Sequence, residues 1–223
     1  MRWLPTFLVA LVTACGPNLS DIPTTGDDTP NPDVTPPTSE IQTRTLAIGL
    51  DTPWDLQIDS AGVIWATERR GVISRIDTST GEVTRVRTIE EVVEVSESGL
   101  LGMALHPNFS AEPFVYVVHS YNEGPGIRNR LIWMHWDGVA LGAAETLLNN
   151  LPGANNHNGS RLAFGPDGML YVTTGDAFDL SSPQNTVSLG GKILRLTPDG
   201  TPAPTTKSIR LGIETRRALC FTP

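Results

Sequence analysis

The chain has 223 residues, with 16 basic and 24 acidic side chains and a formal net charge of −8. This balance disfavours nucleic acid as a partner, because binding to a phosphate backbone relies on an excess of Lys and Arg. Hydrophobic residues make up 39% of the chain, enough for a core. Gly and Pro are frequent and long helical apolar periods are absent, which is typical of β-structure with many turns.

The first 15 residues, MRWLPTFLVALVTAC, are predicted to be a targeting segment. A positive charge at Arg2 precedes an apolar run that is too short for a membrane span. Val12 to Cys15 resembles the bacterial lipobox, whose cysteine is lipidated after cleavage; an ordinary signal peptide containing a cysteine is the alternative. We expect a lipid on Cys15 to anchor the protein to a membrane of a bacterial cell envelope, on its periplasmic or extracellular face.

Residues 16–44 are rich in Pro, Thr and Asp, and few of their side chains suit a core. Such a composition predicts a disordered, extended tether. We expect the folded domain to occupy residues 45–223.

The sequence repeats from about residue 45 onward. LQIDSAGVIWAT (56–67) and LAFGPDGMLYVT (162–173) share period-two alternation around a Gly-containing turn, with Thr two residues after an aromatic residue. Residues 103–120 form the same hairpin pattern with a longer turn, and a further strand follows each hairpin. The roughly 45–60-residue repeat is typical of β-propeller blades. We predict an all-β fold with about three blades, which is part of a propeller because closed ones have about 4–8.

Three motifs resemble the soluble glucose dehydrogenase and sorbosone dehydrogenase family: GLLGMALHPNF (99–109), HNGSRLAFGPDGMLYVTTGDA (157–177) and SLGGKILRLTPDGTPAP (188–204). The resemblance covers most of residues 50–204 and only the N-terminal half of the family's domain. It implies a six-bladed propeller that oxidises aldose sugars with pyrroloquinoline quinone (PQQ) and binds calcium. The family's calcium ligands come later in its sequence, so no metal ligand is assigned here.

His157 is the candidate general base. Oxidation of an alcohol by hydride transfer needs a base for the hydroxyl proton, and an imidazole suits that task near neutral pH. The resemblance makes His157 that base and Asp176 the carboxylate that orients it. The two lie 19 residues apart, at the two ends of one predicted hairpin, so their side chains can meet. The alternative is a turn histidine bonded to local backbone, with Asp176 capping the next loop.

Further site residues follow from the resemblance alone. Glu97 matches a sugar-contacting residue, although it also reads as a solvated member of the acidic run EEVVEVSE. Asn156 stands where a sugar-contacting aspartate is common, and Asn158 is expected to line the cleft. Gln184 falls in a loop that approaches the cofactor. Arg161 is a cofactor candidate because the quinone is anionic, with bracing of a blade as its alternative.

The resemblance breaks at Leu211 to Pro223, LGIETRRALCFTP. The family has a segment like LGHRNPQGLAF there, whose Arg and Asn clamp the quinone; Glu214 and Thr215 occupy their places. Deleting and later restoring one C in a plausible codon series converts GHRNPQGL into GIETRRAL. We hypothesise a compensated frameshift or a sequencing error, with ordinary loop divergence as the alternative. A glutamate repels an anionic quinone, so we expect this chain alone to be inactive.

The sequence thus predicts a membrane-anchored, PQQ-dependent aldose dehydrogenase, whose electron acceptor it does not identify. Two alternatives remain open. One is a non-enzymatic cell-surface propeller that binds a glycan or a protein. The other is a gene fragment without function.

Overall fold

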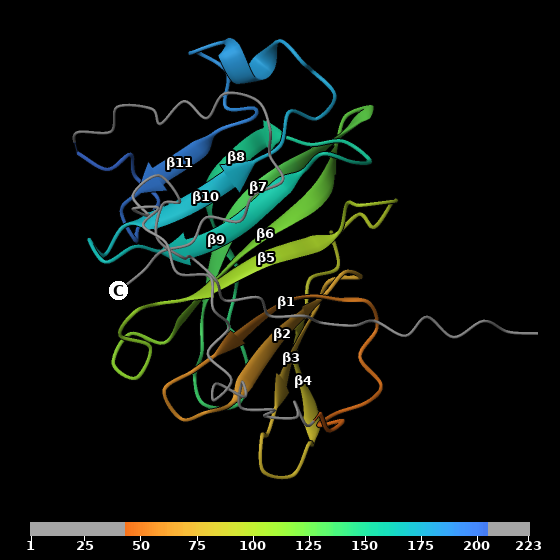
Figure 1. Ribbon diagram of the computed structural model, residues 1–223, viewed down its shortest axis with the longest axis vertical. Helices are drawn as coiled ribbons and strands as arrows, with labels where there is room; N and C mark the ends of the chain where they lie inside the picture. The colour runs from red at the N-terminus through yellow and green to blue at the C-terminus, as the bar shows by residue number, and fades with distance from the viewer. Residues whose placement is uncertain (1–42, 205–223) are drawn as a thin grey trace, which may run out of the picture. The chain divides into compact units, whose positions relative to one another are not determined.

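A computed structural model describes residues 43–204, which form eleven strands and one short 3-10 turn, η1 (Ser182–Gln184) (Figure 1). The predicted targeting segment with Cys15, the tether up to residue 42, and Glu214 and Thr215 lie outside the described residues. Within the described range, no helix has the length and apolar character needed to span a membrane.

The strands form three antiparallel sheets in which each strand pairs with its neighbours in sequence. The first sheet contains β1 (Pro53–Ile58), β2 (Ile64–Glu68), β3 (Val72–Ile76) and β4 (Val83–Thr88). The second contains β5 (Leu100–Leu105), β6 (Phe114–Glu123), β7 (Gly126–His135) and β8 (Glu145–Pro152). The third contains β9 (Gly159–Phe164), β10 (Leu170–Thr174) and β11 (Ile193–Leu196).

These up-and-down sheets are the predicted propeller blades, and the all-β prediction is confirmed. The predicted hairpins 56–67, 103–120 and 162–173 correspond to β1–β2, β5–β6 and β9–β10. In the described range, two blades have four strands and the third has three. Strands β4 and β8 were not predicted from the sequence pattern, because their side chains are mostly exposed or half-buried.

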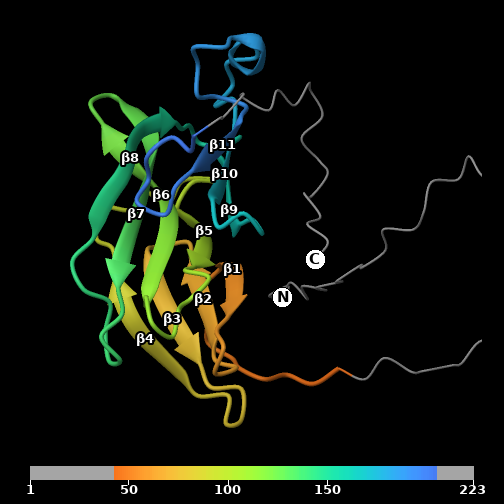
Figure 2. The same cartoon turned by 90° about the vertical axis from the view of Figure 1, so that its left-hand side faces the viewer.

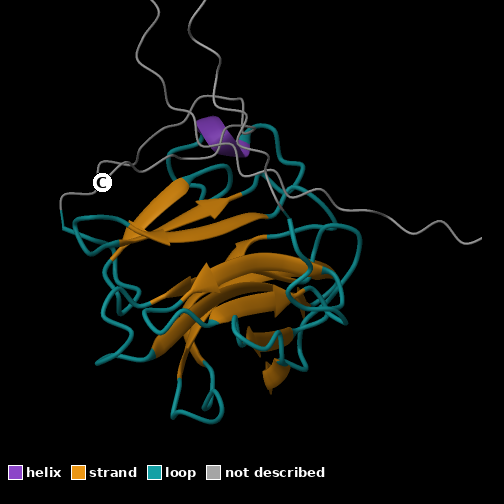
Figure 3. Ribbon diagram, turned by 60° about the horizontal axis from the view of Figure 1, so that its bottom comes forward, coloured by secondary structure: helices purple, strands orange, loops and turns teal. Residues whose placement is uncertain are grey.

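The two hydrophobic cores lie between neighbouring blades, whose sheets are stacked on one another in Figure 3. Strand β6 belongs to both, because alternate side chains of a strand point to opposite faces of the sheet. Val115 and Val117 enter the core with the first blade, and Tyr116 and Val118 enter the core with the third. Burial on both faces explains why the FVYVV run of β6 is continuously apolar.

The first strands of the three blades, β1, β5 and β9, are neighbours. In Figure 2 they lie towards one side of the sheets, with β4 and β8 towards the other. The contact between β5 and β9 is so close that a Cβ added to Gly102 would lie 1.8 Å from the carbonyl oxygen of Ser160. Only glycine allows this approach of two backbones.

Candidate active site

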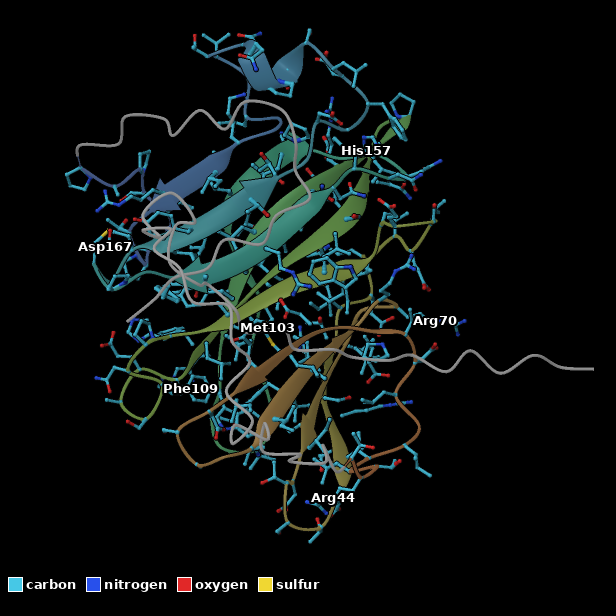
Figure 4. The ribbon with its side chains drawn as sticks, in the orientation of Figure 1. Arg44, Arg70, Met103, Phe109, His157 and Asp167 are labelled. Carbon is cyan, nitrogen blue, oxygen red and sulfur yellow. The ribbon has the colours of Figure 1, made fainter. Side chains whose placement is uncertain are left out.

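All candidate residues except Arg161 lie on connections that reach one end of the blades. These connections are residues 89–99 between β4 and β5, 153–158 between β8 and β9, and 175–192 between β10 and β11. Figure 4 shows His157 at this end and Asp167, in the β9–β10 turn, at the opposite end. Loops from all three blades therefore contribute to one site.

His157 and Asp176 form a hydrogen-bonded pair, with the imidazole Nδ1 2.9 Å from the carboxylate Oδ1. The Asp176 side chain is largely shielded, at 19% exposure, whereas the imidazole is 49% exposed. The backbone N–H of Phe178 also donates to Asp176 Oδ1, at 3.0 Å. The carboxylate is thus held from the backbone side and presents a fixed acceptor to the imidazole.

This arrangement selects one tautomer of His157. Because a carboxylate only accepts hydrogen bonds, the imidazole carries its proton on Nδ1 and donates it to Asp176. The Nε2 atom then holds a lone pair. A half-exposed, oriented imidazole of this kind can accept a proton from a bound hydroxyl group.

The backbone around the pair is strained. His157 has φ +60°, and Ala177 and Phe178 have φ +51° and +69°. The left-handed region costs non-glycine residues free energy and is concentrated at functional sites. The two turns are in close contact, since a Cβ on Gly175 would lie 1.5 Å from the His157 carbonyl oxygen. The strain and this glycine together let Asp176 reach the imidazole.

Glu97 and Asn156 also lie at the site, but both contact protein groups. Glu97 Oε2 accepts a hydrogen bond from the backbone N–H of His157 at 3.0 Å. Its own N–H donates to the carbonyl of Asn155 at 2.8 Å. The Ser96 hydroxyl donates to Asn156 Oδ1. The 96–97 segment is therefore hydrogen-bonded to the turn that carries His157.

Asn158 is buried, at 4% exposure, and its amide is engaged within the protein. Its oxygen accepts from Asn129 Nδ2 at 3.0 Å and from the Ala154 N–H at 3.1 Å. Its nitrogen donates to the Ala154 carbonyl at 2.9 Å. The structure thus places Asn158 beneath the site, where it shapes the 154–158 turn.

Arg161 lies at the start of β9, with its side chain 59% exposed. Its Nη1 is 2.8 Å from Asp55 Oδ1, and its guanidinium lies 4.4 Å from the ring centre of Trp54. Gln184 is exposed in η1, and no contact of its side chain joins it to His157 or Asp176. The structure brings His157, Asp176, Glu97 and Asn156 together and leaves Gln184 apart.

Sequence reasoning missed two residues of this region. Phe178 stacks on the His157 imidazole, with ring centres 4.5 Å apart and planes at 27°. The same ring lines a surface depression with Asn155, Glu123 and Arg128. Asp55, the partner of Arg161, occupies the position in the first repeat that Arg161 occupies in the third. The opposite charges of Asp55 and Arg161 at equivalent repeat positions could have predicted their ion pair, whereas no sequence pattern indicates the role of Phe178.

No three His, Cys, Asp or Glu side chains gather into a candidate metal site within residues 43–204.

The fold and the site define a β-propeller protein with a hydrogen-bonded His–Asp pair at the loop end of its blades. Residues 50–210 match the glucose/sorbosone dehydrogenase family, and the chain belongs to that family.

Solved structures and a curated relative support this assignment. The PQQ-bound aldose sugar dehydrogenase of Streptomyces coelicolor is 39% identical, with a TM-score of 0.68, over 75% of this chain and 51% of that one. An oxidoreductase described as a glucose dehydrogenase, from Thermus thermophilus, is 40% identical, with a TM-score of 0.69, over 74% and 49%. Quinoprotein glucose dehydrogenase B of Acinetobacter calcoaceticus is 30% identical over 60% of this chain and 30% of its own length. The chain thus spans about half of the two solved structures.

Proposed function

We propose that the protein is an oxidoreductase that converts aldose sugars to lactones with PQQ as its cofactor. The observation that carries the proposal is the His157–Asp176 pair, whose 2.9 Å bond leaves Nε2 as the proton acceptor. The family and the PQQ-bound relative support the choice of substrate class and cofactor.

In the proposed reaction, His157 Nε2 accepts the proton of the anomeric hydroxyl as the C1–H bond breaks. Asp176 keeps the Nδ1 proton in place and stabilises the imidazolium that forms. PQQ, when bound, supplies the acceptor for the hydride. Phe178 covers one face of the imidazole, so the ring has a fixed orientation towards the substrate.

The described residues suit an anionic quinone to a limited extent. Arg161 offers an exposed guanidinium with only one edge paired to Asp55, and planar guanidinium groups match carboxylates well. Gln184 is exposed, and the resemblance implies that its loop approaches the cofactor. The resemblance implies that the calcium ligands and the remaining cofactor contacts come later in the family's sequence than the segments matched here, so none is assigned to a residue of this chain. The lipid anchor on Cys15 and the envelope location likewise stay predictions.

A quinone-dependent dye-reduction assay tests the proposal. The gene product, with its reading frame verified through codon 212 and past codon 223, is assayed with a panel of aldoses. PQQ and calcium are each added or omitted. We expect turnover that requires PQQ and is lost in His157→Ala. Absence of turnover with every aldose would refute the proposal and favour a binding protein.

The effect of Glu214 and Thr215 is tested in parallel. Two versions of the full-length gene product are compared in the same assay, one with residues 213–218 as given and one with HRNPQG in their place after Gly212. We expect activity only in the restored version, because Glu214 repels an anionic quinone. Equal activity of both would show that Glu214 and Thr215 are compatible with catalysis.

A further inference from the structure

The segment Ser96–Ser98 is hydrogen-bonded to the turn that carries His157. Three hydrogen bonds join them: Ser96 Oγ to Asn156 Oδ1, Glu97 N to the Asn155 carbonyl, and His157 N to Glu97 Oε2. Three successive residues of the turn are thus bound by two successive residues of the loop.

The segment Ser96–Ser98 is itself hydrogen-bonded to the first blade. Arg69, which follows β2, donates from Nη2 to the carbonyl oxygens of Ser96 and Ser98, the latter at 2.8 Å. The fully buried Ser98 closes the loop, since its hydroxyl accepts from the Val95 N–H at 2.8 Å. Glu97 is therefore presented on a rigid support rather than on a freely solvated loop.

The His157 backbone needs such a restraint. Its φ of +60° is unfavourable for a residue with a side chain, and the conformation persists only where the surroundings hold it. The Glu97 carboxylate accepts the N–H of this very residue, while Asp176 holds the imidazole. A charged acceptor makes the stronger type of hydrogen bond to a backbone N–H.

We infer that Glu97 is a positioning residue that locks the left-handed backbone of His157 and thereby aims its Nε2. This inference differs from the sugar contact that the resemblance implies for Glu97. Its catalytic consequence rests on the proposed function, whereas its structural part does not.

Two variants and one control test the inference. Glu97→Ala removes the acceptor, and Glu97→Gln keeps an oxygen that accepts the His157 N–H without the charge. Glu90→Ala is the matched control, because Glu90 is an exposed carboxylate of the same loop and lies outside the segment Ser96–Ser98. The indole N–H of Trp65, bonded to Asp59 in the turn between β1 and β2, reports that each variant is folded.

The first readout needs neither cofactor nor substrate. Hydrogen exchange of the His157 amide and ¹⁵N NMR of its imidazole are measured on the full chain. In Glu97→Ala we expect faster amide exchange and loss of the single Nδ1-protonated state. Glu97→Gln and Glu90→Ala should retain both. Unchanged His157 signals in Glu97→Ala, or failure of glutamine to retain them, would overturn the inference.

The second readout is kinetic, on the active gene product. Misplacement of a catalytic group by about 1 Å can cost about 10²-fold in rate. We therefore expect kcat to fall about that much in Glu97→Ala, with KM little changed, and glutamine to restore most of it. A rise in KM with unchanged kcat would instead show a sugar contact and overturn the inference. If the wild-type protein turns over no aldose, the proposed function fails, and the NMR result still decides the role of Glu97.

Discussion

Asp55 of β1 and Arg161 of β9 form an ion pair of 2.8 Å that joins the first strands of two blades that are not consecutive. The other carboxylate oxygen of Asp55 accepts the N–H of Met103, in the β5 strand between them, at 3.0 Å. One buried carboxylate therefore joins the first strands of all three blades.

This arrangement predicts unequal effects on stability. Asp55→Ala leaves the buried Met103 N–H without its acceptor, and an unpaired buried donor costs about 1–3 kcal/mol. Arg161→Ala removes a mostly exposed partner, for which about 0–1 kcal/mol is expected. Urea unfolding of both variants measures the difference. Equal losses would show that the ion pair, and not the bond to β5, dominates.

The His–Asp pair predicts a loss of rate without a loss of fold. His157→Ala should lower kcat by about 10²–10⁴-fold, the range expected for a positioned general base. Asp176→Asn should also lower it, because an amide can donate to Nδ1 and move the proton to Nε2. His135→Ala, an exposed histidine at the end of β7, is the control. Circular dichroism checks the fold, and an active His157→Ala would remove this residue from the mechanism.

His119 predicts a pH dependence of stability. Burial in β6 lowers the pKa of His119, and Arg130 acts in the same direction, while the Ser120 carbonyl and Glu91 oppose it. The folded protein thus holds this proton less tightly than the unfolded chain. Its contribution is fully present above the ordinary imidazole pKa of about 6.5 and is lost as the pH falls below it. Thermal unfolding between pH 5 and pH 8 should show an acid limb that shrinks in His119→Gln and persists in His135→Gln.

Substitution of Gly175 is predicted to change both the stability of the fold and the geometry of the His157–Asp176 pair. In Gly175→Ala the new methyl group would lie 1.5 Å from the His157 carbonyl oxygen, so the two turns must separate. We expect about 1–3 kcal/mol of destabilisation, as for other overpacked sites, together with loss of the His157–Asp176 bond. Gly126→Ala is the control, because a Cβ there meets no atom within 4 Å. Urea unfolding and imidazole NMR of the two variants make the comparison.

The blade pattern was predictable because it repeats with simple chemistry. The repeated threonine illustrates this: Thr67 Oγ1 accepts the Asp55 N–H at 3.1 Å, and Thr173 Oγ1 accepts the Arg161 N–H at 2.8 Å. Each hydroxyl bonds to the first strand of its blade near a break in the strand register. The role of this threonine could not be predicted from the sequence, because no particular residue type marks a break in the strand register.

The site was predictable where a hairpin returns the chain to its starting end, as for His157 and Asp176. It was not predictable where loops from different blades meet. The bond from the His157 N–H to Glu97 joins residues 60 apart in sequence, and their distance depends on how two blades pack. Asn158 shows the same limit, since its buried amide bonds to Asn129 in β7 of the preceding blade.

At the end that carries the site, the connections between consecutive blades bear Glu97 and His157, and Asp176 lies on the β10–β11 connection of the third blade. The turn at Asp167, at the other end, is hydrogen-bonded within its own blade. The turn at Asp167 can therefore lengthen within a single hairpin, whereas the longer β5–β6 turn packs Phe109 against Trp65 of the first blade. If one blade slipped by a single residue, about 3.3 Å along the strand, the hydrogen bonds between the His157 turn and the segment Ser96–Ser98 would be lost. Mutational tolerance should thus differ between two ends built from the same strands.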